Sequence, residues 1–235
     1  MIRSRFLQTE TKEGKLMAIL SLENICFSYS RTPVLKDVSY EFEKGKIYCI
    51  IGKSGAGKTT LLSLLSGLAS PDSGKILYDG KDVAKIDKYT FRSKYIGVVF
   101  QNFNLLTKFT AAENVVLSMD IAGTKKINKK EKALELLSSV GLSADEANRR
   151  VLHLSGGQQQ RVAIARALSY DPDIILADEP TGNLDGETQK EIMDIFRSLA
   201  EQGKCVILVS HSPDVAKMCD EIYELTKISG GKMKK

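Results

Sequence analysis

The chain has 235 residues, of which 43% are hydrophobic and 27% are charged, a composition typical of a soluble globular protein with one large domain. Its formal net charge of +5 is too small for a dedicated nucleic-acid-binding protein, so no nucleic-acid partner is expected. No apolar run approaches the roughly 18 residues of a membrane span, and residues 1–15 lack the apolar stretch of a signal peptide. We therefore expect a cytoplasmic protein that reaches a membrane only through a partner.

Short apolar or alternating runs predict strands at 20–29, 34–42, 46–51, 75–78, 96–100, 174–177, 205–209 and 221–225. Apolar residues at helical spacing predict helices at 59–68, through much of 102–170, at 187–202 and from 214 onward. Strands that alternate with helices indicate an α/β fold whose parallel sheet is covered on both faces. Polar side chains follow several of these strands, and open α/β sheets bind ligands at the carboxyl ends of their strands.

The two ends of the chain lack such patterns. Residues 1–17 are polar, which predicts a flexible extension before the folded domain at 18–229, and residues 230–235 form a basic tail. Met1 and Met17 are both compatible with being the native start.

Residues 52–59 fit the pattern G-x-x-x-x-G-K-[ST] between a predicted strand and a predicted helix. Glycines let successive backbone N–H groups point at phosphate oxygens, and the following helix adds the positive end of its dipole. Lys58 can reach the β and γ phosphates, and the Thr59 hydroxyl suits Mg²⁺. A glycine-rich turn without a nucleotide is the alternative, and the order of strand, loop and helix argues against it. The expected nucleotide-binding residues are Gly52, Lys53, Ser54, Gly55, Ala56, Gly57, Lys58, Thr59 and Thr60.

An acidic pair, Asp178 and Glu179, follows the predicted strand at 174–177. A carboxylate at this strand end can help to hold Mg²⁺ beside a phosphate loop. A second carboxylate next to it can orient or deprotonate the attacking water, so we expect Glu179 to be the general base. The alternative is an exposed acidic pair that only adds solubility.

Residues 154–161 read Leu-Ser-Gly-Gly-Gln-Gln-Gln-Arg, just ahead of a predicted helix. Small residues at a helix N-terminus form an anion site, although a serine N-cap with a flexible lead-in is the simpler alternative. Together with the two motifs above, this segment makes residues 19–229 resemble the ABC ATPase superfamily, whose signature is Leu-Ser-Gly-Gly-Gln. The resemblance implies a P-loop NTPase (RecA-like) core with a mostly parallel sheet, an N-terminal antiparallel β subdomain and an α-helical subdomain inserted at about 102–165.

The same resemblance implies that ATP, with Mg²⁺, joins two copies head to tail. Each signature segment would then cap the γ-phosphate held by the other subunit, through Ser155, Gly156, Gly157 and Gln158. Asp185 matches the loop residue that touches the opposite subunit. Both halves of the composite site are intact in this one chain, so a homodimer with two working sites is expected, and a heterodimer is not excluded.

Three further residues match the family pattern. Tyr29 matches the aromatic residue that stacks on adenine, although a strand aromatic packed on a neighbour is the alternative. Gln101 matches the glutamine that reaches Mg²⁺ and the water, and His211 matches the histidine that contacts the γ-phosphate. The expected catalytic residues are thus Glu179, His211, Gln101 and Lys58, and the expected Mg²⁺ ligands are Thr59, Gln101 and Asp178.

Residues 100–106, 158–160 and 180–185 look like those of a bacterial subgroup that serves macrolide export, lipoprotein release, bacitracin-type peptide resistance and cell division. This resemblance implies a separate integral membrane permease as partner, of the exporter or mechanotransmission type, with the ATPase at the inner face of the cell membrane. Residues 149–153 depart from the family pattern because they lack its proline. A soluble ABC-type ATPase acting outside transport is the alternative function.

Four apolar residues between 103 and 109 would form a socket for the permease if they are exposed, or internal core if they are not: Phe103, Leu105, Leu106 and Phe109. The basic stretch at 125–132 would face anionic lipid headgroups or, as a simpler interpretation, solvent.

Overall fold

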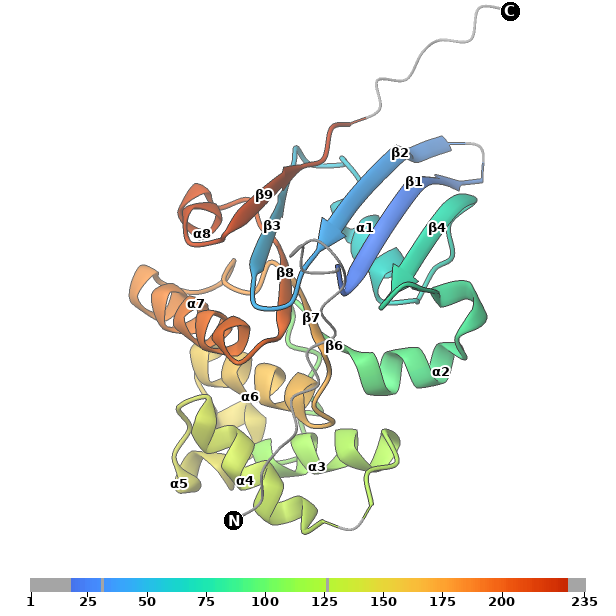
Figure 1. The fold of residues 1–235 in the computed structure, drawn as a ribbon. Coiled ribbons are helices and arrows are strands. Elements are labelled where there is room, and N and C mark those ends of the chain that lie inside the picture. Colours follow the sequence, from blue (N-terminus) through green and yellow to red (C-terminus); the bar gives the residue numbers. More distant parts are fainter. Residues whose placement is uncertain (1–17, 31, 126, 228–235) are drawn as a thin grey trace, which may run out of the picture.

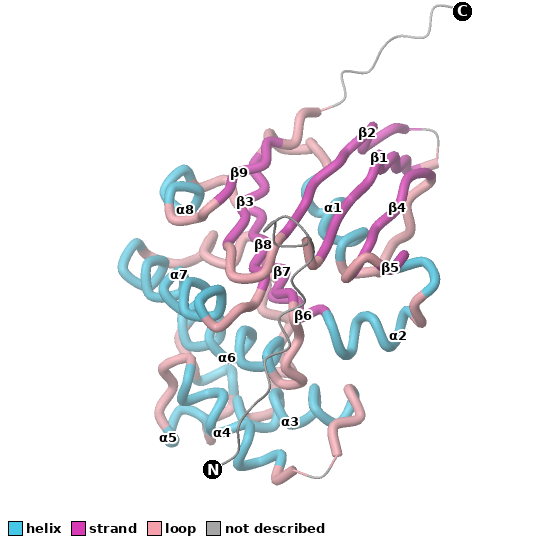
Figure 2. The backbone as a smooth tube through the Cα atoms, in the orientation of Figure 1, coloured by secondary structure: helices cyan, strands magenta, loops and turns pink. Residues whose placement is uncertain are grey.

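The computed structural model describes residues 18–30, 32–125 and 127–227, so the predicted extension at 1–17 and the tail at 230–235 lie outside the described residues. The described chain forms two sheets surrounded by helices (Figure 1, Figure 2). The first sheet is antiparallel and has the order β2–β1–β4–β5. Its strands are β1 (Leu20–Tyr29), β2 (Thr32–Phe42), β4 (Ser73–Tyr78) and β5 (Lys81–Asp82).

The second sheet has the order β6–β7–β8–β3–β9, and all of its strand pairs are parallel. Its strands are β3 (Ile47–Ile51), β6 (Ile96–Val99), β7 (Ile174–Asp178), β8 (Cys205–Val209) and β9 (Glu221–Glu224). Because parallel neighbours need long crossovers, every connection between these strands carries at least one helix or the antiparallel sheet. The predicted fold class, an α/β core with a parallel sheet and an N-terminal antiparallel sheet, is confirmed.

The helices lie mainly beside the parallel sheet and below it in the view of Figure 1. Their bounds are α1 (Lys58–Leu65), α2 (Lys88–Thr90), α3 (Ala111–Ile121), α4 (Lys129–Ser139), α5 (Ala144–Ala147), α6 (Gly156–Leu168), α7 (Gly186–Glu201) and α8 (Pro213–Lys217). Three short turns of 3₁₀ or π helix occur at η1 (Val83–Lys85), η2 (Phe91–Tyr95) and η3 (Val151–His153). In the described ranges, no helix combines the length and the apolar character needed to cross a membrane.

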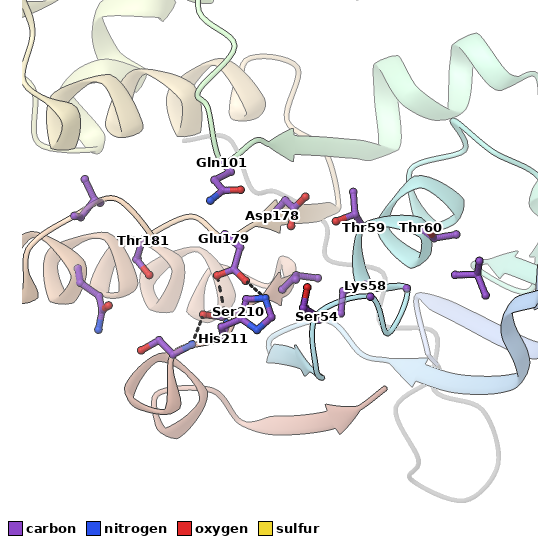
Figure 3. A pocket seen from close by; sticks show the side chains of 18 residues that line it. Ser54, Lys58, Thr59, Thr60, Gln101, Asp178, Glu179, Thr181, Ser210 and His211 are labelled. Carbon is purple, nitrogen blue, oxygen red and sulfur yellow. Dashed lines mark hydrogen bonds and ion pairs between the residues drawn. The ribbon is translucent and has the colours of Figure 1, made fainter. Parts of the chain in front are cut away.

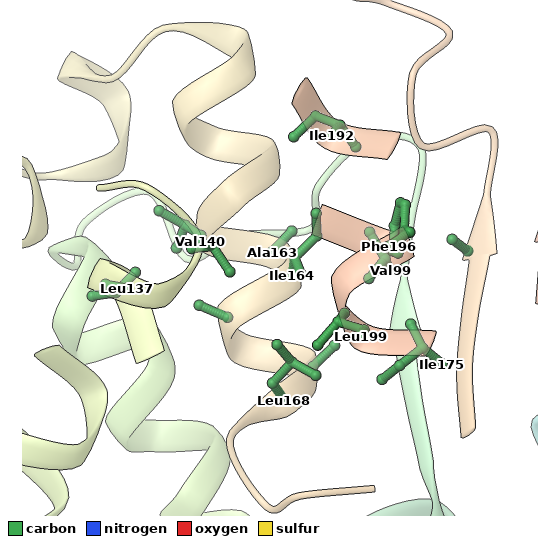
Figure 4. Packing of buried hydrophobic residues seen from close by; sticks show 14 of the residues in the cluster. Val99, Leu137, Val140, Ala163, Ile164, Leu168, Ile175, Ile192, Phe196 and Leu199 are labelled. Atoms are coloured by element: carbon green, nitrogen blue, oxygen red, sulfur yellow. The ribbon is translucent and has the colours of Figure 1, made fainter. Parts of the chain in front are cut away.

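Both faces of the parallel sheet are buried, as the sequence predicts. Successive side chains of a strand point to opposite faces, so each strand contributes to two cores. On β8, Val206 and Leu208 join the core formed with α3, α6 and α7, whereas Ile207 and Val209 join the core formed with α1 and the antiparallel sheet. Figure 4 shows the first core, in which residues of α6 and α7 pack against β6 and β7. This packing aligns the carboxyl ends of β3, β7 and β8 at one edge.

Two local predictions differ from the structure. The helix predicted at 59–68 ends at Leu65, because Gly67 has φ +70° and turns the chain, which leaves the Leu68 side chain 61% exposed. The short elements between 81 and 95 were not predicted, since their sequence has no apolar period. Asp82 and Asp87 organise this segment by accepting hydrogen bonds from Ala84 N–H and Thr90 N–H.

Phe196 on α7 tests the contribution of this core, since its ring is fully buried. We expect Phe196→Ala to lower the free energy of unfolding by about 3–5 kcal/mol, because it removes the ring and leaves a cavity. Asp194→Ala, on the exposed side of the same helix, should change it by less than about 1 kcal/mol, although Asp194 pairs with Lys190. Urea unfolding of both variants measures the two changes, and equal unfolding midpoints would contradict the contribution of Phe196 to this core.

Candidate active site

A pocket of about 800 Å³ opens at the carboxyl ends of β7 and β8, beside the loop between β3 and α1 (Figure 3). The structure brings ten of the predicted site residues together around it: Ser54, Gly55, Gly57, Lys58, Thr59, Thr60, Gln101, Asp178, Glu179 and His211. These residues come from four separate stretches of the chain, which the packing of the parallel sheet gathers at one edge.

The loop from 52 to 57 can take its path only with glycine at certain positions. Gly55 and Gly57 have φ values of +75° and +98°, which lie in the left-handed region. A Cβ on Gly57 would lie 2.9 Å from Val34 Cγ1, and one on Gly52 would lie 2.5 Å from the carbonyl oxygen of Leu225. The loop therefore curls tightly between β2, β9 and the start of α1, with Ala56 buried beneath it.

Lys58 places a positive charge at the bottom of this loop. Its side chain is buried, and Nζ donates to the carbonyl oxygens of Gly52 at 2.8 Å and Lys53 at 3.4 Å. No carboxylate of the described residues forms an ion pair with it. A buried ammonium needs compensating negative charge, and the phosphate oxygens of a nucleotide would supply it. The loop and its lysine thus fit a polyphosphate.

A carboxylate, a hydroxyl and an amide face one another across the pocket. Burial raises the pKa of Asp178 above its usual range, although the hydrogen bond from Thr59 and the charges of Lys58 and His211 act in the opposite direction. Gln101 lines the same pocket, and its Nε2 lies close to Gly182, 3.7 Å from where a Cβ on that glycine would be. Oxygen atoms of these types are the ligands that Mg²⁺ prefers, and Mg²⁺ usually completes its shell with phosphate and water. The residues therefore fit Mg²⁺, which would neutralise charge on the phosphates when bound.

Glu179 and His211 lie against each other at the far side of the pocket (Figure 3). Glu179 Oε2 accepts a hydrogen bond from His211 N–H at 3.3 Å, and His211 Nε2 lies 3.3 Å from Oε1. Oε1 is nevertheless a buried oxygen without a hydrogen-bond donor among the described residues, since the imidazole contact lacks hydrogen-bond geometry. Glu179 also has φ +45°, an uncommon conformation for a residue with a side chain. The local backbone thus holds an unpaired carboxylate oxygen beside the pocket, where a water could donate to it.

The remaining predicted residues lie outside this pocket. Gly52, Lys53 and Ala56 shape the loop through their backbone. Tyr29 ends β1 with its side chain 56% exposed, and its ring packs edge-to-face on Phe27 at 5.0 Å between centroids. This exposure and the contact with Phe27 are compatible with both sequence interpretations.

The signature residues lie at the N-terminus of α6 and are not brought to this pocket. Ser155 and Gly156 are exposed, and a Cβ on Gly157 would lie 2.6 Å from Thr188 Cγ2 of α7. Asp185 caps α7 and accepts from Thr188 N–H at 2.9 Å. The Gln158 side chain is engaged inside its own subunit, because its Oε1 accepts from Ser155 N–H at 2.8 Å.

Some residues that line the pocket were not predicted as site residues from the sequence. Thr181, Gly182, Ser210 and Ser212 flank predicted site residues, and their proximity in the chain was the available signal. Other lining residues, Val34 of β2 and Leu184 and Gln189 at or near α7, carry no local signal, because only tertiary packing brings them to the pocket.

A parallel sheet with a glycine-rich phosphate loop between β3 and α1 defines the P-loop NTPase class. The family model described as ABC transporter matches residues 35–182. This match, together with a relative that is 49% identical over 90% of the chain, shows that the chain belongs to the ABC transporter family. It is an ATP-binding and ATP-hydrolysing subunit of that family, with Mg²⁺ as its cofactor.

That relative is the uncharacterized ABC transporter ATP-binding protein YclH of Bacillus subtilis strain 168, of which 95% is covered. The lipoprotein-releasing system ATP-binding protein LolD of Bacteroides thetaiotaomicron is 41% identical over 88% of this chain and 96% of its own. The macrolide export ATP-binding/permease protein MacB of Campylobacter jejuni is 40% identical over 88% of this chain but only 33% of its own. A dimeric, post-hydrolysis structure of the ATP-binding cassette MJ0796, bound to ADP and Pi, superposes with TM-score 0.80, 36% identity and coverage of 88% and 96%. These relatives include members of the subgroup that the sequence predicts.

The raised pKa of Asp178 predicts an effect of pH on stability. When the pKa of an aspartate is higher in the folded than in the unfolded state, its ionised form destabilises the fold. Lowering the pH relieves this destabilisation, because the folded state becomes protonated at a higher pH than the unfolded state. Without ligands, Asp178→Asn should therefore raise the melting temperature at pH 7, and its advantage should shrink as the pH falls toward about 4. The same variant should lose much of the stabilisation that Mg²⁺–ATP gives the wild type.

Asp185→Asn is the control, with the opposite sign. Its hydrogen bonds with Thr188 lower the pKa of Asp185, so its ionised form stabilises the fold above the unfolded pKa. Asp185→Asn should lower the melting temperature at pH 7, and this loss should fade in acid. Thermal unfolding of both variants from pH 7 down to about 3, below the ordinary aspartate pKa of about 3.9, gives the comparison, and a shift of the same sign in both at pH 7 would contradict it.

Proposed function

We propose that this ATPase works as a head-to-tail homodimer that drives a separate membrane permease of the exporter or mechanotransmission type. The observation that carries the dimer is the separation of the two predicted phosphate-binding segments. The pocket holds the phosphate loop, Asp178 and Glu179, whereas Ser155 and Gly156 are exposed at the N-terminus of α6 and do not line it. Two copies facing in opposite directions would bring each α6 N-terminus to the other copy's nucleotide, and the dimeric arrangement of the MJ0796 cassette supports this proposal.

In this proposal the residues of the pocket divide the chemistry. Backbone N–H groups of the loop and Lys58 hold the phosphates, while Thr59, Asp178 and Gln101 hold Mg²⁺. Glu179 orients a water and takes one of its protons, so that the water oxygen bonds to the γ-phosphorus and the bond to ADP breaks. His211, fixed against Glu179, contacts the γ-phosphate. These roles follow from positions in the pocket and from the family resemblance.

The other predicted residues act at the edges of the site. Tyr29, which is exposed at the end of β1, stacks on the adenine. Ser155, Gly156, Gly157 and Gln158 cap the γ-phosphate of the opposite subunit, because the first N–H groups of a helix have no partners within it. Asp185 lies at the start of α7, beside this segment, and contacts the opposite subunit. Residues 102–165 form the inserted helical subdomain of a domain at 18–229.

A groove of about 320 Å³ is our proposed docking surface for the permease. It lies between the end of α1, β6 and the last turns of α6, and Leu68, Val98 and Phe100 give it an apolar lining. Two cations face it, Arg92 and Arg166, and neither forms an ion pair with a carboxylate of the described residues. Arg166 is partly buried, which lowers its pKa, and among the described residues its donors reach the carbonyl oxygens of Phe103 and Asn104. We therefore expect the permease to insert a short apolar segment that carries a carboxylate.

The four apolar residues predicted to form the permease socket divide into two pairs. Phe103 and Leu105 pack against the core beside α6, whereas Leu106 and Phe109 are 44% and 41% exposed. An apolar residue in a loop can face either way, so the sequence left both interpretations open.

The place of the ATPase, peripheral on the inner face of the cell membrane, belongs to the same proposal. It is supported by the family, by LolD, which is the ATP-binding protein of a lipoprotein-releasing system, and by MacB, an ATP-binding/permease protein. The alternative, a soluble ABC-type ATPase acting outside transport, predicts that no permease accompanies the chain.

Glu179→Gln tests the general base and the dimer together. The amide keeps the size of the side chain but does not accept a proton, so ATP should still bind while turnover falls by at least about 100-fold. Because hydrolysis no longer opens the site, ATP should convert the variant from monomer to dimer, as light scattering would show. Wild-type turnover in this variant would remove Glu179 as the base.

Purification of the tagged chain from detergent-solubilised native membranes, with Mg²⁺ and ATP present, tests the permease. We expect a stoichiometric multi-span protein with a large extracytoplasmic domain to accompany the wild type. Arg92→Glu should abolish this association, because it reverses a charge that faces the groove. Lys94→Glu, an exposed reversal on the same turn outside the groove, should retain it. Recovery of only soluble proteins, ribosomes or nucleic acid would instead favour the alternative function.

A further inference from the structure

Two helix N-termini, that of α5 and that of α6 in the signature segment, each have a complete capping box. At α5, Ser143 N–H and its hydroxyl donate to Glu146 Oε2 at 2.7 and 2.8 Å. At α6, Ser155 N–H donates to Gln158 Oε1 at 2.8 Å, and Gln158 N–H donates to Ser155 Oγ at 3.3 Å. Each box satisfies N–H groups that the helix itself leaves without partners.

One hydrogen bond joins the two boxes. Gln158 Nε2 donates to Glu146 Oε1 at 2.6 Å, so each oxygen of this carboxylate serves a different helix. These hydrogen bonds, first of all those from Ser143, lower the pKa of Glu146 below its usual range, and the charge of nearby Arg149 acts in the same direction. Glu146 therefore stays ionised at neutral pH and only accepts hydrogen bonds.

The link decides which way the Gln158 amide faces. A glutamine amide can turn over, so that its oxygen and nitrogen exchange places, unless its partners distinguish them. Because an ionised carboxylate accepts only, Glu146 holds the NH₂ group on its own side, and the amide oxygen then faces Ser155 N–H. Ser155 Oγ already accepts from Gln158 N–H, and its hydroxyl proton stays available to donate to an anion.

We propose that Glu146 is a positioning residue for the signature segment: it fixes the Gln158 amide so that Ser155 presents its hydroxyl donor to the nucleotide of the opposite subunit. The inference rests on the proposed head-to-tail dimer. Glu146 contacts no nucleotide itself in this arrangement, since its two oxygens are occupied by Ser143 and Gln158. It acts on the step that closes the dimer around ATP and leaves the chain's own pocket unchanged.

Glu113 offers a matched control. It completes the same kind of capping box on α3, where Thr110 N–H donates to Glu113 Oε2 at 2.7 Å and Glu113 N–H donates to Thr110 Oγ1 at 3.2 Å. In the described part of the chain no hydrogen bond connects Glu113 to α6. Glu146→Gln and Glu113→Gln thus weaken equivalent caps, and only the first also breaks the link to Gln158.

The experiment introduces each change into Glu179→Gln and measures the ATP concentration that gives half-maximal dimer by analytical ultracentrifugation. We expect Glu146→Gln to raise this concentration by at least about tenfold, the size of one charge-assisted hydrogen bond, and Glu113→Gln to leave it unchanged. Melting temperatures should fall in both, and further in Glu146→Gln, which also loses the hydrogen bond from Gln158. Binding of a fluorescent ATP analogue to the monomer should match the parent.

Equal dimerisation of the two variants would overturn the role of Glu146. A Glu179→Gln parent that stays monomeric with ATP would instead overturn the dimer itself, and the inference with it. A loss of analogue binding to the Glu146→Gln monomer would also count against the inference, because it would show damage to the chain's own pocket.

Discussion

The burial of the parallel sheet on both faces is the constraint on which the rest of this structure depends. A parallel sheet needs cover on each side, and here α3, α6 and α7 pack on one face while α1 and the antiparallel sheet pack on the other. Only the strand ends then remain free for polar chemistry. The carboxyl ends of β3, β7 and β8 meet at one edge, and the phosphate loop, the acidic pair and His211 follow them directly.

Charge at this edge is arranged for a ligand rather than for the protein alone. Lys58 is buried with only carbonyl partners, burial raises the pKa of Asp178, and Glu179 Oε1 has no hydrogen-bond donor among the described residues. Each of these features costs stability in the free protein, and each becomes favourable beside a polyphosphate, a hard cation or a water. Elsewhere polar groups are largely paired, as the two capping boxes at α5 and α6 show.

Sequence could predict the elements whose pattern is local. The strands and the long helices carry apolar periods, and the phosphate loop is a contiguous motif whose glycines meet a geometric need at Gly55 and Gly57. The sequence did not predict that α1 ends at Leu65, because Gly67 acts through its left-handed backbone. It also did not predict that Val34 and Gln189 line the pocket, since tertiary packing brings them there. The link from Glu146 to Gln158 was invisible for the same reason, since it joins two helices that meet only in the folded chain.

The close approach of Gly52 to the Leu225 carbonyl has a consequence for biosynthesis. β3 pairs only with β8 and β9, which follow it by more than half the length of the chain, and Leu225 closes over the loop just beyond β9. A ribosome delivers the phosphate motif well before it delivers β8, β9 and Leu225. The nascent chain thus carries an incomplete nucleotide site until these later segments have been made and have packed beside β3.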